Sequence, residues 1–452
     1  MQKHYKRVYI TTALPYVNSV PHVGFAWEIL IADAMARYFR NQGKEVLFLT
    51  GSDENSFRIA LAAEIKGISV RELIDTNSGR FIDLKRALNL SFDIFFRTSS
   101  KVHHKGARKI WRKFNNDDVY RANWSAWYCL GCESFYKKDK LIDGKLCPEH
   151  LKELEFVNED VYFFKFNKHK DELIKLFNNN SINIIPPVKK KEIIDEIKEF
   201  HDFNISRHKV NNWGVDVPEK GYNEVIYAFL EALVGYINGI GYQDKLGKFE
   251  KWWQDPNTRI IHVFGRGITR FHTVYWPVVL SSADLRLPTD VFVHGYLTAD
   301  GQKISKSLGN TIDPLDLVKG YSIDQVRFYF FSNFSPFKDG DFSMLDLKKV
   351  SETEFKRIDL LIKLAINKLR SKKIDLIVGK RVKNRIEKLE KEYVKHMELF
   401  HFQQALDVSV RSLELVKNME DFNTIRLALA KFSIFIEPFM PNLSSNISRK
   451  IN

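Results

Sequence analysis

The hydrophobic pattern at the start of the chain predicts a strand, a helix and a second strand. Residues 8–12 are β-prone, and residues 26–41 have the length and apolar composition of a buried helix. Gly43 marks the end of that helix, and residues 45–49 form the next expected strand. This order predicts parallel strands joined by a crossover helix.

The same pattern returns in the second half of the chain. Residues 260–264 and 291–294 are expected strands, and residues 268–282 between them form an expected helix. Both blocks therefore predict an α/β fold with a parallel sheet. Such a sheet binds ligands beyond the carboxyl ends of its strands, where loop residues converge, so we expect the functional residues in these loops.

The last quarter of the chain has a different pattern. From residue 345 onward glycine almost vanishes, and Lys, Leu, Ile and Glu recur at helical spacing, which predicts a helical bundle. One expected apolar stripe consists of Leu360, Leu361, Leu364, Ala365 and Leu369. Between the two α/β blocks lies an insertion at about residues 117–217, which holds every cysteine of the chain.

Charge and composition narrow the class of protein. The formal net charge of +14 favours a polyanionic partner such as nucleic acid, although base composition alone can also produce a lysine-rich sequence. No segment approaches the roughly 20 apolar residues of a membrane helix, and the apolar run at residues 8–10 is too short for a signal peptide. Three cysteines make a poor disulfide framework, so we expect a reducing, cytoplasmic setting.

The cysteines have the spacing of a metal site. Cys129 and Cys132 form a C-x2-C pair, and Cys147 and His150 form a C-x2-H pair after fourteen intervening residues. Two short ligand pairs across a loop suit tetrahedral Zn²⁺, and four protein ligands leave no open position, which predicts one structural zinc. The alternative is three unrelated buried cysteines and a surface histidine.

Two further motifs suit phosphate groups. His22 and Gly24 lie between the first strand and the first helix, where backbone N–H groups and the helix dipole favour an anion. Much later in the chain, Lys303 and Lys306 lie on a loop with Ser305 and Ser307. Two lysines on one loop can neutralise a polyphosphate, and the serines can hydrogen-bond to it. Either motif alone is weak, but the pair is more specific.

These motifs resemble those of the class I aminoacyl-tRNA synthetases. Residues 21–24 resemble the HIGH motif, and residues 303–307 resemble the KMSKS motif with Ile in place of Met. The flanking segments are similar to methionyl-tRNA synthetases in particular. They are residues 12–18, 50–54, 205–207, 213–218 and 339–343, together with the single zinc knuckle.

The resemblance implies a Rossmann-like parallel sheet of the class I synthetase type, split by a zinc-knuckle insertion and followed by a C-terminal α-helical bundle. The expected segments are the first half of the nucleotide-binding catalytic domain at 1–116, the insertion at 117–217, the second catalytic half at 218–295, the KMSKS loop and stem-contact region at 296–344, and the reduced anticodon-binding-type bundle at 345–452.

The activity implied is ATP-dependent activation of methionine, or a related amino acid, and its transfer to tRNA, with Mg²⁺ accompanying ATP. The catalytic residues implied are His22, Lys303 and Lys306. The implied ATP-binding residues are Asn18, His22, Gly24, Gly265, His294, Gly295, Lys303, Ser305, Lys306 and Ser307. The implied amino-acid-binding residues are Leu14, Tyr16, Asp53, Phe229, Tyr236 and His272, in which Asp53 would accept the substrate ammonium group.

The chain departs from the family pattern at several of these places. Phe25 replaces the last histidine of the HIGH motif, and Gly267 replaces the aspartate of a G-K-D segment near the ribose. Phe229 replaces a pocket tryptophan, which predicts a larger cavity, and Asn55 replaces the histidine of a D-E-H segment. The family's anticodon-reading pattern, an Asn, then a Tyr and then a Pro-Trp pair at intervals, has no counterpart near residues 415–418.

Three functions remain open on this basis. The first is a methionine–tRNA ligase, the second a paralogue that activates another amino acid or uses a non-standard acceptor, and the third an inactive binding protein. Phe229 and the shortened bundle favour the second, whereas Phe25 and Gly267 favour the third. The family's usual dimerising appendage would follow the bundle, whereas the sequence stops at Asn452, so we expect a monomer.

Overall fold

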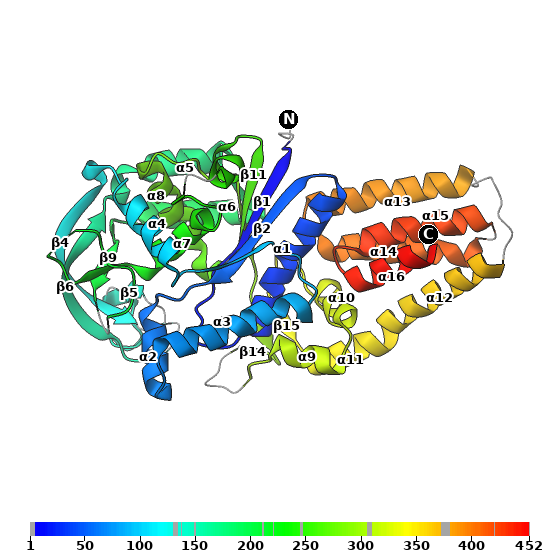
Figure 1. Ribbon diagram of the computed structural model, residues 1–452, viewed down its shortest axis with the longest axis horizontal. Coiled ribbons are helices and arrows are strands. Elements are labelled where there is room, and N and C mark those ends of the chain that lie inside the picture. Colours follow the sequence, from blue (N-terminus) through cyan, green and yellow to red (C-terminus); the bar gives the residue numbers. More distant parts are fainter. Residues whose placement is uncertain are drawn as a thin grey trace.

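The computed structural model describes residues 5–129, 134–136, 138–148, 151–209, 212–219, 221–244, 247–304, 310–371, 380–419 and 421–451. Figure 1 shows a sheet-containing part at one end, a bundle of helices at the other, and helix α1 between them. Within the described ranges, no helix is long and apolar enough to cross a membrane.

The central sheet confirms the predicted α/β architecture. Its six parallel strands lie in the order β3-β2-β1-β11-β12-β7. The strands are β1 (Arg7–Thr12), β2 (Glu45–Ser52), β3 (Ile94–Arg97), β7 (Asn183–Ile185), β11 (Thr258–Gly265) and β12 (Asp290–His294). Each of the four strands expected from the apolar pattern is present, and β1 pairs directly with β11 across the insertion.

The helices of this part cover the two faces of the sheet and the ends of its strands. They are α1 (Val23–Asn41), α2 (Phe57–Lys66), α3 (Val70–Ala87), α4 (Lys101–Trp111), α7 (Ala228–Asn238) and α8 (Trp276–Ser282). After β12 come the short strands β13 (Leu297–Ala299) and β14 (Gln302–Lys303), which form a small sheet with β15 (Gly340–Phe342). The helices α9 (Pro314–Gly320), α10 (Ile323–Asn333) and α11 (Met344–Val350) connect this region to the bundle.

The insertion forms an antiparallel sheet of its own but does not stand wholly apart. Its strands are β4 (Val119–Cys129), β5 (Ser134–Tyr136), β6 (Glu155–Phe164) and β8 (Phe203–Asn204), and its helices are α5 (Lys170–Asn178) and α6 (Lys190–Glu199). A small pair, β9 (Ser206–His208) with β10 (Glu224–Ile226), leads back to the part that holds the central sheet. Strand β7 lies within the insertion in sequence, yet it pairs with β12 at the edge of the central sheet.

The expected helices after residue 345 are also present. They are α12 (Lys356–Ser371), α13 (Lys380–Glu398), α14 (Phe402–Glu414), α15 (Phe422–Ile436) and α16 (Pro441–Ile451). The predicted stripe on α12 is only partly correct, because Leu360 and Leu364 are exposed whereas Leu361, Ala365 and Leu369 are buried. The buried face is shifted toward Ile358, Ile362 and Ile366 because these residues face α14, α15 and α16.

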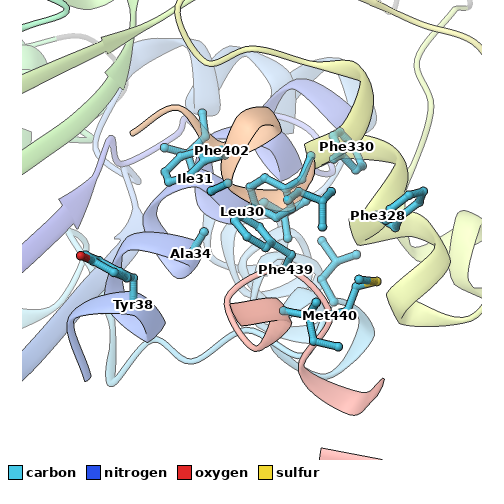
Figure 2. Packing of buried hydrophobic residues seen from close by; sticks show 14 of the residues in the cluster. Leu30, Ile31, Ala34, Tyr38, Phe328, Phe330, Phe402, Phe439 and Met440 are labelled. Atoms are coloured by element: carbon cyan, nitrogen blue, oxygen red, sulfur yellow. The ribbon is translucent and has the colours of Figure 1, made fainter. Parts of the chain in front are cut away.

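Helix α1 is buried along almost its whole length. The sheet covers one side of the helix, and α10 and the bundle cover the other. Most of its side chains are therefore buried, and most of the buried ones are apolar. Figure 2 shows Leu30, Ile31 and Ala34 of α1 among aromatic side chains of α10 and the bundle. Trp27 stacks on Phe330 of α10 with ring centroids 6.0 Å apart. Burial of this kind fixes the position of both ends of the helix.

A buried ion pair joins α1 to α10 and to the turn before α16. Asp33 accepts from Arg37 at 2.8 Å and from Arg327 at 2.7 Å, and both Asp33 and Arg327 are fully buried. Arg327 also donates to the carbonyl groups of Leu88, Pro438 and Phe439. Burial alone would raise the pKa of Asp33, but the two guanidinium groups hold it below the usual value.

Removing this carboxylate leaves buried positive charge without its partner. We expect Asp33→Ala to lower the free energy of unfolding by about 3–5 kcal/mol in urea denaturation. The matched control is Asp316→Ala, because Asp316 forms an exposed ion pair with Lys319 on α9 and should change stability very little. Equal effects of the two substitutions would show that the buried pair does not hold α1 in place.

Candidate functional site

A cavity of about 890 Å³ opens at the carboxyl ends of β1, β2, β11 and β12. Most of the side chains expected at the site meet there, although they come from segments up to about 280 residues apart. The predicted residues that line it are Leu14, Tyr16, His22, Gly24, Asp53, Phe229, Tyr236, Gly265, His272, His294 and Gly295. Among the residues predicted to bind the nucleotide or the amino acid and whose side chains the structure describes, only Asn18 does not line this cavity.

His22 occupies the N-cap of α1. Its Nδ1 accepts a hydrogen bond from the backbone N–H of Gly24 at 3.1 Å. Because Nδ1 accepts, the ring proton sits on Nε2, and the neutral imidazole presents a donor together with the positive end of the helix dipole. A Cβ atom at residue 24 would lie 2.9 Å from His22 Cε1, so glycine is required there for the ring to keep this position. The arrangement suits an anionic oxygen.

The loop at residues 305–309 lies outside the described residues, and Ser305, Lys306 and Ser307 belong to it. Residues on both sides of the loop lie at the cavity or at the start of α1. Ile304 lines the same cavity, and the carbonyl of Ile312 accepts from the backbone N–H of Val23 at 3.1 Å. Lys303 ends β14, where it pairs with Thr298 of β13. The two phosphate-binding motifs of the sequence thus belong to neighbouring parts of the fold.

The part of the cavity beside Tyr236 and His272 is largely apolar, and these two polar side chains are neutral. His272 donates from Nδ1 to the carbonyl of Ile268 at 3.1 Å, which leaves Nε2 to accept from the hydroxyl of Tyr236 at 2.8 Å. Burial lowers the pKa of His272 to about 4 and raises that of Tyr236 well above its usual value. A pocket of this kind favours an uncharged side chain, because a buried charge would find no counter-charge.

Phe229 and Asp53 close this end. The ring of Phe229 stacks on Phe271 at a centroid distance of 3.9 Å and stands 6.1 Å from Tyr16, so the position keeps an aromatic wall. Asp53 follows β2, is almost fully buried, and borders the cavity. A buried carboxylate beside an apolar pocket suits a substrate ammonium group.

The structure adds Glu28 to the residues expected from the sequence. His294 donates from Nδ1 to the carbonyl of Gly295 at 2.8 Å, and its Nε2 lies 3.0 Å from Oε2 of Glu28. Oε1 of Glu28 is buried and has no hydrogen-bond partner among the described residues, and Glu28 lines the cavity. A carboxylate within the apolar run of α1 was the signal in the sequence that could have identified it.

Arg266, Tyr296 and Asp339 also line the cavity and were not predicted. The guanidinium of Arg266 lies over the ring of Tyr296 at 4.4 Å and forms a 3.0 Å ion pair with Asp339. Phe25 borders the cavity as well, but its ring packs against the edge of Phe81 at 4.9 Å. An apolar contact therefore stands at this position in place of a hydrogen-bond donor.

The cysteine site is described only in part. Cys129 and Cys147 are buried in one small cluster with Leu154, whereas Cys132 and His150 lie outside the described residues. In the portion of the chain that is described, no group of three or more His, Cys, Asp or Glu side chains is placed to hold a metal ion.

Comparison with known sequences decides the family. The sequence model of "tRNA synthetases class I (M)" matches residues 8–155 and 151–358. This chain belongs to that family of ligases. The predicted resemblance to the methionyl-type class I synthetases is confirmed.

Individual relatives agree with the family. A methionine–tRNA ligase of Thermotoga maritima is 34% identical over 482 residues, which cover 99% of this chain and 75% of that protein. A methionine–tRNA ligase of Brucella suis is 40% identical over 346 residues, which cover 75% of this chain and 65% of that protein. This chain thus spans about two thirds to three quarters of the length of these synthetases.

Solved structures show the same fold. The methionyl-tRNA synthetase of Mycobacterium tuberculosis in complex with methionyl-adenylate matches with a TM-score of 0.89 and 29% identity, over 98% of this chain and 93% of that chain. Its apo form matches with a TM-score of 0.81 and 27% identity, over 99% of this chain and 92% of that chain.

The buried state of His272 predicts how stability depends on pH. The pKa of this histidine is about 6.5 in the unfolded chain and about 4 in the folded one, so between these values only the unfolded chain binds the proton. The contribution of the neutral His272 side chain to the free energy of unfolding is complete above pH 6.5 and declines as the pH falls toward 4. We expect His272→Gln to reduce the loss of unfolding free energy between pH 7 and pH 5 by up to about 2 kcal/mol.

Urea unfolding at pH 5, 6 and 7 measures this difference. His201→Gln, at an exposed histidine, provides the matched control. An unchanged pH dependence in His272→Gln would mean that the imidazole is not held neutral in the pocket.

Proposed function

We propose that this synthetase activates methionine with ATP and transfers it to tRNA. The observation that carries the proposal is the meeting, in one cavity, of the His22 end of α1, the Asp53 carboxylate and the neutral aromatic pocket of Tyr236 and His272. These are respectively an anion site, an ammonium site and a site for an uncharged side chain. The methionine–tRNA ligase relatives support methionine as the amino acid.

The order of the strands sets the direction in which the substrates lie. Asp53 follows β2 and Leu14 follows β1, so the amino acid occupies the β1–β2 side of the cavity. Gly265 follows β11 and His294 ends β12, so the nucleoside occupies the opposite side. The N-terminus of α1 follows β1, and this position supports binding of the α-phosphate beside His22.

The reaction then needs positioning more than proton transfer. An oxygen of the methionine carboxylate forms a bond to the α-phosphorus, and the bond from phosphorus to the bridging oxygen breaks and releases pyrophosphate. The N–H of His22 Nε2 donates to a phosphate oxygen on which charge accumulates, and Lys303 and Lys306 neutralise the leaving pyrophosphate. ATP enters as its Mg²⁺ complex. Attack by a tRNA ribose hydroxyl on the adenylate carbonyl then forms the ester and releases AMP.

The unusual residues of the site are compatible with this chemistry. Phe25 supplies no phosphate donor, so His22 and the lysine loop provide a larger share of the charge stabilisation. Glu28 lines the cavity, and its Oε1 has no hydrogen-bond partner among the described residues, so we propose that it supplies a carboxylate acceptor for a ribose hydroxyl, although residue 267 is glycine.

We also propose that Cys129, Cys132, Cys147 and His150 hold one structural Zn²⁺. The spacing of the four residues and the burial of Cys129 and Cys147 in one cluster support this set. The metal would fix the turn between β4 and β6 and take no part in the chemistry. The net charge of +14 supports tRNA as the polyanionic partner, and we propose a monomeric enzyme that works in the cytoplasm.

Methionine-dependent ATP–pyrophosphate exchange with the purified protein, screened across amino acids, tests the function. We expect exchange with methionine, and we expect Lys306→Ala to reduce it by at least about 100-fold while the thermal unfolding curve stays unchanged. Lys363→Ala on α12 is the matched control, because this lysine is exposed and distant from the cavity. Exchange with another amino acid alone would indicate a redirected paralogue, and no exchange with any amino acid would indicate an inactive binding protein.

Metal analysis and chelation test the zinc site. We expect one zinc per chain, loss of that zinc in Cys132→Ser, and a decrease in Tm of roughly 5 °C or more after chelation, reversed when zinc is restored. A zinc-free preparation with the same Tm as the chelated and the zinc-treated protein would rule the site out.

A further inference from the structure

The space beside Gly267 is filled by the hydroxyl group of Tyr296. A Cβ atom at residue 267 would overlap the Tyr296 oxygen and lie 3.2 Å from its Cζ. Both residues line the cavity, Gly267 on the loop after β11 and Tyr296 on the loop after β12. A side chain at residue 267 would therefore require the end of the Tyr296 ring to move. The glycine and the tyrosine form a complementary pair.

Tyr296 is held in this position by the surrounding residues. Its backbone N–H donates to Oδ1 of Asp339 at 2.9 Å, and its carbonyl accepts from the N–H of Gly340 at 2.9 Å. Arg266 lies over the ring at 4.4 Å and pairs with Oδ2 of the same aspartate at 3.0 Å. A guanidinium over an aromatic face fixes the plane of the ring. The hydroxyl therefore stays over Gly267, although the residue is 43% exposed.

A second polar group, the His294 ring, adjoins Gly265, which lies two residues before Gly267 on the loop after β11. The ring of His294, which pairs with Glu28, stands where a Cβ atom at Gly265 would be 3.3 Å from its Cε1. The loop after β11 thus exposes two glycine positions to the nucleoside side of the cavity. The Glu28–His294 pair adjoins one position and the Tyr296 hydroxyl adjoins the other. A ribose carries two neighbouring hydroxyl groups, and a carboxylate oxygen with a phenol oxygen can satisfy both.

We propose that Tyr296 is a nucleotide-positioning residue, whose hydroxyl hydrogen-bonds to a ribose hydroxyl of ATP in place of a carboxylate from residue 267. The inference rests on the proposed function only in that the cavity takes ATP. A phenol can donate and accept, so it makes this contact without placing a further negative charge beside the triphosphate. The Arg266–Asp339 pair serves to orient the ring.

Binding of ATP, 2′-deoxyATP and 3′-deoxyATP, measured by calorimetry, tests this assignment. We expect Tyr296→Phe to weaken ATP binding about 5- to 10-fold, the loss of one hydrogen bond. For the deoxynucleotide that lacks the contacted hydroxyl, the wild-type protein and Tyr296→Phe should bind equally. Tyr222→Phe is the matched control, since Tyr222 has a similar exposure of 46% and lies outside the cavity wall.

A double substitution tests the complementarity of the pair. We expect Gly267→Ala alone to weaken ATP binding because its Cβ displaces the Tyr296 hydroxyl, and to add no further loss in the Tyr296→Phe background. Thermal unfolding of every variant shows whether the fold is intact. The proposal is overturned if Tyr296→Phe binds ATP as the wild type does, or loses the same factor for all three nucleotides.

These readouts separate the ribose contact from the proposed reaction. Nucleotide binding is measured without an amino acid, whereas methionine activation is measured by pyrophosphate exchange. Absence of exchange together with the expected effect of Tyr296→Phe would overturn methionine activation and support the ribose contact.

Discussion

The parallel pairing of β1 with β11 is the constraint on which the site depends. These strands are about 250 residues apart in sequence, and their registered pairing runs from Arg7 with Thr258 to Thr12 with Val263. Thr11 and His262 also share a 2.6 Å hydrogen bond within the sheet. Because both strands end at the same edge, the loop that begins at Ala13 and the loop that begins at Gly265 border one cavity. Without this pairing the amino-acid side and the nucleoside side would not meet.

Helix α1 runs from the cavity to the helical bundle. His22 at its N-cap and Glu28 line the cavity, and Asp33 pairs with Arg327, which also binds the turn before α16. A buried, close-packed helix transmits a displacement of one end to the other rather than absorbing it. The packing of α10 and of the turn before α16 against α1 therefore helps to fix the helix that carries His22 at its N-cap.

The sequence was sufficient for the features that repeat or that lie close together along the chain. Strand and helix periodicity predicted the parallel sheet, and the resemblance to the class I synthetases implied most of the residues that line the cavity. Features that depend on packing in three dimensions were not predictable. Which face of α12 is buried depends on where α14 to α16 lie, so Leu360 and Leu364 were misplaced. Strand β7 joins the central sheet from inside the insertion, and no local pattern indicates that pairing.

The departures from the family pattern show the same limit. Residue 267 carries no carboxylate, and the hydroxyl of Tyr296, 29 positions later, lies where a Cβ atom of that residue would be. At the position of the pocket tryptophan, Phe229 stacks on Phe271, so the wall is aromatic there. Substitutions in a binding site gain their meaning from the neighbours that adjust to them, and these neighbours are distant in sequence.

The central claim is that one nucleotide is held between the N-terminus of α1 and the lysine loop. The most direct test is a crystal structure with a non-hydrolysable methionyl-adenylate analogue. The account predicts that the group replacing the phosphate lies within hydrogen-bond distance of His22 Nε2, with Lys306 on its other side and the adenosine over Gly265 and Gly267. An analogue bound away from the end of α1, or one that leaves His22 without contact, would contradict it.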